Sequence, residues 1–154
     1  MTTKIIIAMH KPYKTPEESV YLPLHVGAEG KDMIPGLTRD DTGENISSKN
    51  PMYCELTGLY WAWKNLDADY YGFFHYRRYL NFSENKYPLD SWQNITEERL
   101  NDTCLKKYNL NDDCIRNLVE TYDIVLSEEK NVAKMPDRNT SVYEQYKNGR
   151  SLNI

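Results

Sequence analysis

Ile5-Ile6-Ile7-Ala8-Met9 is a continuous apolar run rich in β-branched side chains, and polar His10-Lys11-Pro12-Tyr13 follows it directly. A short run without apolar–polar alternation predicts a strand that is buried on both faces, as in a parallel sheet. The run is too short for a signal peptide or a membrane span. We therefore expect the chain to begin with a strand of an α/β sheet.

Extended and helical patterns alternate after this strand, which predicts parallel strands joined by right-handed crossovers. Thr15-Pro16-Glu17-Glu18 resembles a capping box and predicts a short helix. Leu22, Leu24 and Val26 then alternate in an extended segment, where Pro23 favours a sheet edge or an irregularity. Residues 29–49 contain many turn formers, and they predict either a functional loop or a surface insertion.

The clearest helical pattern begins at Asn50, a residue suited to capping, with Pro51 at the first helical position. Gly58 would allow close approach to a neighbouring strand. The helix is followed by a predicted strand over residues 70–80. The apolar stripe that we expect the helix to bury consists of Met52, Leu56, Leu59, Trp63 and Leu66.

Two further helices are predicted, one after Thr96 and one after Asn111, with the strand Ile124-Val125-Leu126 behind them. The apolar side of the first holds Leu100, Cys104 and Tyr108, and that of the second holds Cys114, Ile115, Leu118, Val119 and Tyr122. Beyond Ser127 only Val142, Tyr143 and Tyr146 suggest a helical turn. We expect an α/β domain over residues 1–126 and the start of a truncated C-terminal part over 127–154.

Charge and cysteine content narrow the class of protein. The net charge is -4 and the chain has no basic block, which argues against a nucleic-acid-binding protein. Cys54, Cys104 and Cys114 share no metal-type spacing, so we expect buried free thiols and a reducing, cytoplasmic compartment. Peripheral contact with the inner face of a membrane stays open.

Two predicted strand ends carry residues that suit an anionic ligand, because ligands of open α/β sheets bind at the carboxyl ends of the strands. One end is His10-Lys11-Pro12-Tyr13, and the other is His75-Tyr76-Arg77-Arg78-Tyr79. A guanidinium group can bind a diphosphate through two hydrogen bonds. If the strand continued, Arg77 and Arg78 would point to opposite faces. The alternative is an ordinary edge strand with solvated arginines.

Other motifs point to no specific chemistry. Asp67-Ala68-Asp69 has the spacing of a metal-binding Asp-x-Asp element, but it precedes a strand, so we favour a structural turn. His10, His25 and His75 fit no recognised ligand spacing. The chain lacks the glycine-rich motifs of dinucleotide-binding and P-loop proteins and the Gly-x-Ser-x-Gly turn of hydrolases.

Several blocks of the sequence together resemble a domain of unknown function found in bacterial capsular and exopolysaccharide biosynthesis proteins, which is grouped with GT-A-type glycosyltransferases. The similarity is strongest over residues 4–82. The blocks that carry it are Ile5–Lys11, Leu24–Ala28, Asp41–Asn50, Tyr53–Asn65 and Gly72–Leu80.

The resemblance implies a GT-A-like, Rossmann-type fold: a mixed, mainly parallel sheet flanked by helices, which we expect to be incomplete at its C-terminus. It implies transfer of a sugar from a nucleotide donor, UDP-linked in the galactofuranosyltransferase-like members, to a surface glycan or a lipid-linked acceptor. The segment His75–Arg78 occupies the place where other GT-A enzymes carry their metal-binding Asp-x-Asp. This placement disfavours Mg²⁺ or Mn²⁺ as a cofactor without excluding either.

The hypothesis assigns three groups of residues to donor binding and leaves the catalytic base unassigned. A non-catalytic or truncated remnant that binds a nucleotide sugar or a partner without turnover is the alternative. Other polysaccharide-assembly enzymes are further candidate partners. His10, Lys11 and Tyr13 would line the nucleotide pocket with His75, Arg77 and Arg78; Asp41, Thr42, Asn45, Ser47 and Asn50 would close over it; Glu55 and Trp61 would shape its sugar end.

Overall fold

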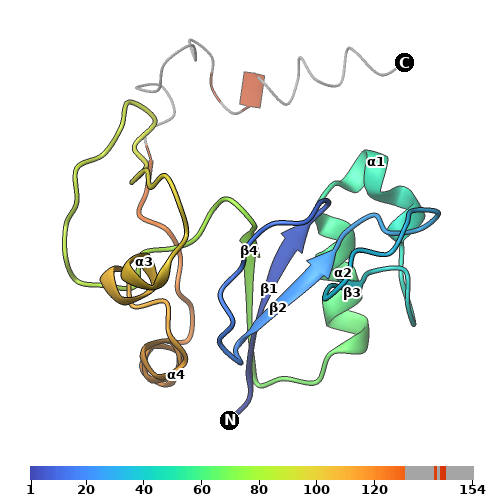
Figure 1. The fold of residues 1–154 in the computed structure, drawn as a ribbon, viewed down its shortest axis with the longest axis horizontal. Helices are drawn as coiled ribbons and strands as arrows, with labels where there is room; N and C mark the ends of the chain where they lie inside the picture. Colours follow the sequence, from blue (N-terminus) through green and yellow to red (C-terminus); the bar gives the residue numbers. More distant parts are fainter. Residues whose placement is uncertain (131–140, 142, 145–154) are drawn as a thin grey trace. The chain divides into compact units, whose positions relative to one another are not determined.

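The computed structural model describes residues 1–130, 141, 143 and 144. The chain forms two compact units, Met1–Ser83 with Arg99–Val125 and Glu84–Glu98 with Leu126–Ile154. The first unit contains the whole sheet (Figure 1). Of the helical turn expected near the C-terminus, Val142 and Tyr146 lie outside the described residues.

The sheet has four strands, and every pair is parallel: β1 (Thr3–Met9), β2 (Tyr21–His25), β3 (Thr38–Arg39) and β4 (Tyr70–His75), in the order β3-β2-β1-β4. Because β1 lies inside the sheet, its residues need apolar side chains on both faces. Ile5 through Met9 are each at most 4% exposed. The predicted parallel α/β fold is confirmed.

One face of the sheet is covered by α2 (Leu56–Asn65), as Figure 1 shows. Gly58 makes the contact close, since a Cβ there would lie 2.7 Å from Val26 Cγ1 and 3.1 Å from Leu24 Cδ2. The predicted close approach of helix and strand is therefore confirmed. The buried cluster between them consists of Ile6, Ala8, Leu24, Val26, Trp61 and Ala62.

The predicted single helix from Asn50 is wrong in continuity and in its buried face. The chain forms a 3-10 turn, η1 (Ser47–Lys49), a short α1 (Asn50–Tyr53), and then breaks at Cys54, whose φ is 49°, before α2. The break changes the phase, so α2 buries the small residues Thr57, Gly58 and Ala62 together with Trp61. The predicted stripe stays exposed, with 83% at Met52 and 69% at Trp63, except for partly buried Leu66.

The opposite face packs against the segment that carries α3 (Asp102–Lys107) and α4 (Asp112–Thr121). The Tyr21 hydroxyl on β2 donates to the Leu110 carbonyl. The helix predicted after Asn111 is confirmed, and Asn111 caps it by accepting from the Cys114 amide. The helix expected after Thr96 begins only at Asp102, with Asn101 as its cap.

Three local predictions are wrong for identifiable reasons. Residues 15–18 form no helix, because Glu18 accepts from the Asp112 amide at 3.5 Å instead of capping its own segment. Ile124 and Leu126 are 74% and 80% exposed, and no strand forms there. Cys54 is exposed because it lies at the helix break. Pro23 agrees with its prediction, since β3 pairs only with Leu24 and His25.

Candidate functional site

The strand order places a switch point between β1 and β4. The chain moves outward from β1 to β2 and β3, and the crossover through α2 then brings β4 to the other side of β1. In open parallel sheets the crevice at such a reversal, beyond the carboxyl ends of the strands, is the preferred ligand position. Here those ends are Met9 and His75, and their polar continuations lie side by side.

A buried tyrosine lies at the centre of the polar segments that follow the carboxyl ends of β1 and β4. These segments, residues 10–13 and 75–78, are called the β1–β4 edge below. Tyr76 is 1% exposed, and its ring lies 5.2 Å from the ring of His10 and 5.2 Å from that of Tyr13. Lys11 Nζ and Arg77 Cζ lie 5.8 and 5.1 Å from the same centroid, within the range of cation–π attraction. Tyr76 therefore collects cationic and aromatic side chains from both strand ends.

The arginine segment is a turn and does not continue the strand. β4 ends at His75, and the Arg78 amide donates back to the His75 carbonyl at 2.8 Å. The predicted strand over residues 70–80 is therefore too long. The Tyr76 amide still donates to the Ala8 carbonyl at 3.2 Å, and the Tyr76 ring is buried. Arg77 and Arg78 are both exposed.

His75 connects this edge to the helix break. Its Nδ1 accepts a hydrogen bond from the Arg77 amide at 3.2 Å, so the neutral ring carries its hydrogen on Nε2. Nε2 lies 3.9 Å from Glu55 Oε1. Burial lowers the pKa of His75; Glu55 acts in the opposite direction, and the charges of Arg77 and Arg78 lower the pKa further. Among the predicted residues, His10, Lys11, Tyr13, Glu55, His75 and Arg77 are brought together here.

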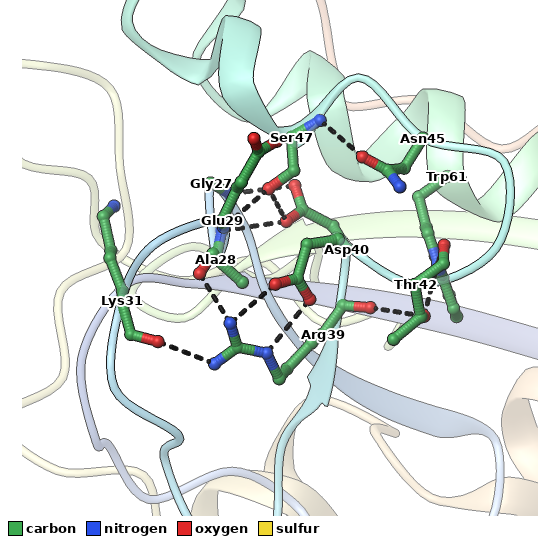
Figure 2. A network of polar contacts seen from close by, with 11 residues as sticks. Gly27, Ala28, Glu29, Lys31, Arg39, Asp40, Thr42, Asn45, Ser47 and Trp61 are labelled. Atoms are coloured by element: carbon green, nitrogen blue, oxygen red, sulfur yellow. Dashed lines mark hydrogen bonds and ion pairs between the residues drawn. The ribbon is translucent and has the colours of Figure 1, made fainter.

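The predicted closing loop has a different construction, which Figure 2 shows. Asp40 is fully buried, and its carboxylate accepts from the amides of Gly27 and Ala28 at 2.8 and 2.9 Å. It also accepts from the hydroxyls of Ser47 and Thr57 at 2.5 and 2.7 Å. The sequence analysis did not identify Asp40 as a structural centre. In the sequence Asp40 is one of several turn-forming residues, and it follows β3, which is too short to be recognised as a strand.

The rest of this loop is bonded to itself or to α2. Arg39 and Asp41 form a two-point ion pair of 3.0 and 2.6 Å, and this pairing with Arg39 lowers the pKa of Asp41. The indole of Trp61 donates to the Thr42 carbonyl at 3.0 Å, and Trp61 is itself only 5% exposed. We therefore reassign Trp61 from the sugar end to the support of the loop.

The remaining loop residues predicted to bind donor also have partners. Asn45 Oδ1 accepts from the Ser47 amide at 3.1 Å. The side-chain Nδ2 of Asn50 donates to the Cys54 carbonyl at 2.7 Å and to the Thr57 hydroxyl at 3.2 Å. These contacts hold η1 and α1 against α2.

Two of the weaker candidates lie elsewhere. Asp69 accepts from the Thr2 amide at 2.7 Å, at the amino ends of β1 and β4. This contact agrees with a structural turn at Asp67-Ala68-Asp69. His25 is 2% exposed, and no described residue bonds to either of its ring nitrogens. Within the described residues, no group of three or more His, Cys, Asp or Glu side chains could hold a metal ion.

These features define a class: a parallel α/β domain with a cationic, aromatic ligand edge at its switch point. The chain belongs to the family described as "Domain of unknown function (DUF4422)", whose model matches residues 4–154. No curated protein matches the chain.

A solved structure extends the comparison. The chain is similar to the apo structure of WbbM, a bifunctional glycosyltransferase, with 43% identity and a TM-score of 0.74. The match covers 78% of this chain and 21% of that one, so the chain spans about a fifth of the length of the structure it matches. No helix in the described part of the chain is long and apolar enough to cross a membrane.

Proposed function

We propose that this chain is the donor-binding domain of a glycosyltransferase, and that the β1–β4 edge binds the diphosphate of a nucleotide sugar. The observation that carries the proposal is the group of His10, Lys11 and Arg77 around buried Tyr76 at the switch point. The 43% identity to part of a bifunctional glycosyltransferase supports the reaction class.

Glycosyl transfer needs positive charge at the leaving group, and the cationic side chains of this edge can supply it. A bond forms between the acceptor oxygen and the anomeric carbon, and the acceptor hydroxyl gives its proton to a general base, which remains unassigned; the bond from that carbon to the diphosphate breaks, and the leaving group takes the electron pair. Fixed positive charge stabilises the nucleoside diphosphate as it leaves. Arg77 and Lys11 supply this charge here, and Arg78 adds to it from the same turn.

The finer parts of the proposal follow from the resemblance to capsular and exopolysaccharide biosynthesis proteins. The donor is UDP-linked, with galactofuranose as one candidate sugar, and the acceptor is a growing surface glycan or its lipid-linked precursor. The domain acts on the cytoplasmic side, where peripheral contact with the membrane would bring it to a lipid-linked acceptor.

Calorimetry with UDP and UDP-sugars tests donor binding. We expect saturable binding by the chain, and its loss in the Arg77→Ala/Arg78→Ala double variant. Arg99→Ala/Lys106→Ala is the matched control, because it removes the same charge from exposed positions at α3. No binding by the unaltered chain, or equal losses in both double variants, would refute a donor site at the β1–β4 edge.

A transfer assay separates the enzyme from a binding remnant. The alternative is a domain that binds the nucleotide sugar without turnover. Incubation with UDP-sugars and a lipid-linked acceptor is expected to yield glycosylated acceptor. Donor binding without any transfer would favour the remnant.

A further inference from the structure

Both histidines of the β1–β4 edge contact the Tyr76 ring, but they differ in burial and in their neighbours. His10 is exposed, whereas His75 is partly buried and has Glu55 Oε1 at 3.9 Å from its Nε2. In the described chain, Glu55 is the carboxylate that forms an ion pair with a histidine of this edge. His75 can therefore become a paired cation without moving far.

The position of Glu55 depends on an unusual backbone conformation. Cys54, directly before it, has φ of 49°, a region that residues other than glycine seldom adopt. The break ends α1 and starts α2 at Leu56, so Glu55 lies at the junction. Unusual backbone of this kind is frequent where a side chain has to be aimed at a site. Here the side chain beside it faces His75.

We propose that Glu55 is a positioning residue that acts through His75: it holds the imidazole as a cation when a nucleoside diphosphate occupies the β1–β4 edge, so the diphosphate binds with uptake of a proton. This inference rests on the proposed donor site, and it deepens that site by assigning the protonation state in which His75 contacts the ligand.

The electrostatic surroundings explain why the proton arrives with the ligand. The groups that face His75 are Glu55 at the helix junction, Arg77 and Arg78 in the turn, and His10 at the end of β1. Without ligand, burial and the neighbouring cations favour the neutral ring. A bound diphosphate offsets those cations, and the imidazolium then lies between two anionic groups, the carboxylate and the phosphate.

The hydrogen bond of Nδ1 changes with the proton. In the neutral ring Nδ1 accepts from the Arg77 amide. An imidazolium has hydrogen on both nitrogens, so Nδ1 becomes a donor and this bond must break. The Arg77 amide and Nδ1–H are then two donors for phosphate oxygens, while Nε2–H donates to Glu55.

Titration calorimetry with UDP tests this coupling in buffers of different ionisation enthalpy. The measurements are made at pH 7.5, because the phosphate itself titrates near pH 6. We expect the observed enthalpy to change with the buffer in the direction of proton uptake. Since proton uptake opposes binding as the pH rises, the affinity for UDP should fall by up to about tenfold per pH unit between the pKa of His75 without ligand and its higher pKa in the complex.

Variants assign the proton to one residue. His75→Asn should abolish the buffer dependence, and Glu55→Gln should weaken it while UDP still binds. His10→Asn is the matched control and should retain it. Glu55 is exposed, so the folded state of Glu55→Gln can be confirmed by an unchanged denaturation midpoint.

The outcomes separate this inference from the donor site itself. If the unaltered chain binds no UDP, the proposed function fails. If UDP binds with the same enthalpy in every buffer, the donor site stands and the role of Glu55 is refuted. Loss of the buffer dependence in His10→Asn, with retention in His75→Asn, would also overturn it.

Discussion

The β1–β4 edge and the loop that begins at Asp40 follow carboxyl ends of the same parallel sheet, and they use polar residues in opposite ways. In the loop, Asp40 is fully buried and its oxygens accept from four donors. At the edge, His10, Lys11 and Arg77 are exposed around one buried ring. Polar groups that satisfy one another build a scaffold, whereas groups that face solvent are available to a ligand.

The largest effect is expected at Asp40. Asp40→Ala removes the acceptor of two amides and two hydroxyls, and buried donors without partners are costly, so we expect a loss of about 3–5 kcal/mol in the free energy of unfolding. Asp41→Ala is the control, since its partly exposed pair with Arg39 should contribute about 1 kcal/mol. Denaturant unfolding measures both, and equal losses would contradict a scaffold centred on Asp40.

Arg77 should show the reverse behaviour. Arg77→Ala removes an exposed side chain, so the free energy of unfolding should change by less than about 1 kcal/mol. The affinity for UDP should fall about 10–100-fold, as expected when one charge-assisted contact to phosphate is lost. Unfolding and calorimetry on the same preparation separate the two quantities. If Arg77→Ala were strongly destabilised but bound UDP with normal affinity, the β1–β4 edge would have a structural role and the comparison would fail.

Buried His25, at the end of β2, should make the free energy of unfolding depend on pH. Burial, followed by the charges of Lys31 and Arg39, lowers the pKa of this histidine in the folded state. The unfolded chain therefore binds more protons below about pH 6.5, so stability falls as the pH is lowered, by at most about 1.4 kcal/mol per pH unit for this group. His25→Phe should flatten the curve measured between pH 8 and 5, leaving the slope that other groups such as His75 contribute. An unchanged slope would contradict a buried neutral ring.

The sequence predicted the frame of the fold because its strongest patterns are local. The β-branched run Ile5–Ile7 defined a strand buried on both faces, and Gly58 marked the close contact between helix and sheet. The buried face of α2 could not be predicted, because no sequence pattern marks the break at Cys54, across which the side chains of Asn50 and Asp40 bond to Thr57. The exposed stripe with Met52 and Trp63 is the consequence.

The candidate site was predictable in composition and only partly in grouping. His10-Lys11 and His75-Arg77 stand out as polar segments after strands, and the parallel order places them together. The sequence does not single out Tyr76 as a site residue, because nothing in it shows that the ring is buried between both segments. The Asp40 network depends on β3, whose two residues are too few to produce a strand pattern.

The smallest change in stability is expected at Thr42, which belongs to the loop yet is exposed. This residue therefore tests whether the loop is only a scaffold or also contacts the ligand. Its hydroxyl accepts from the Trp61 indole at 3.1 Å and donates to the Arg39 carbonyl at 2.9 Å. In Thr42→Val the indole keeps the Thr42 carbonyl as its acceptor, so the free energy of unfolding should fall by only about 0.5–1 kcal/mol. If the loop is purely a scaffold, the affinity for UDP in calorimetry stays unchanged. A clear loss of affinity in this stable variant would show that the loop contacts the donor after all.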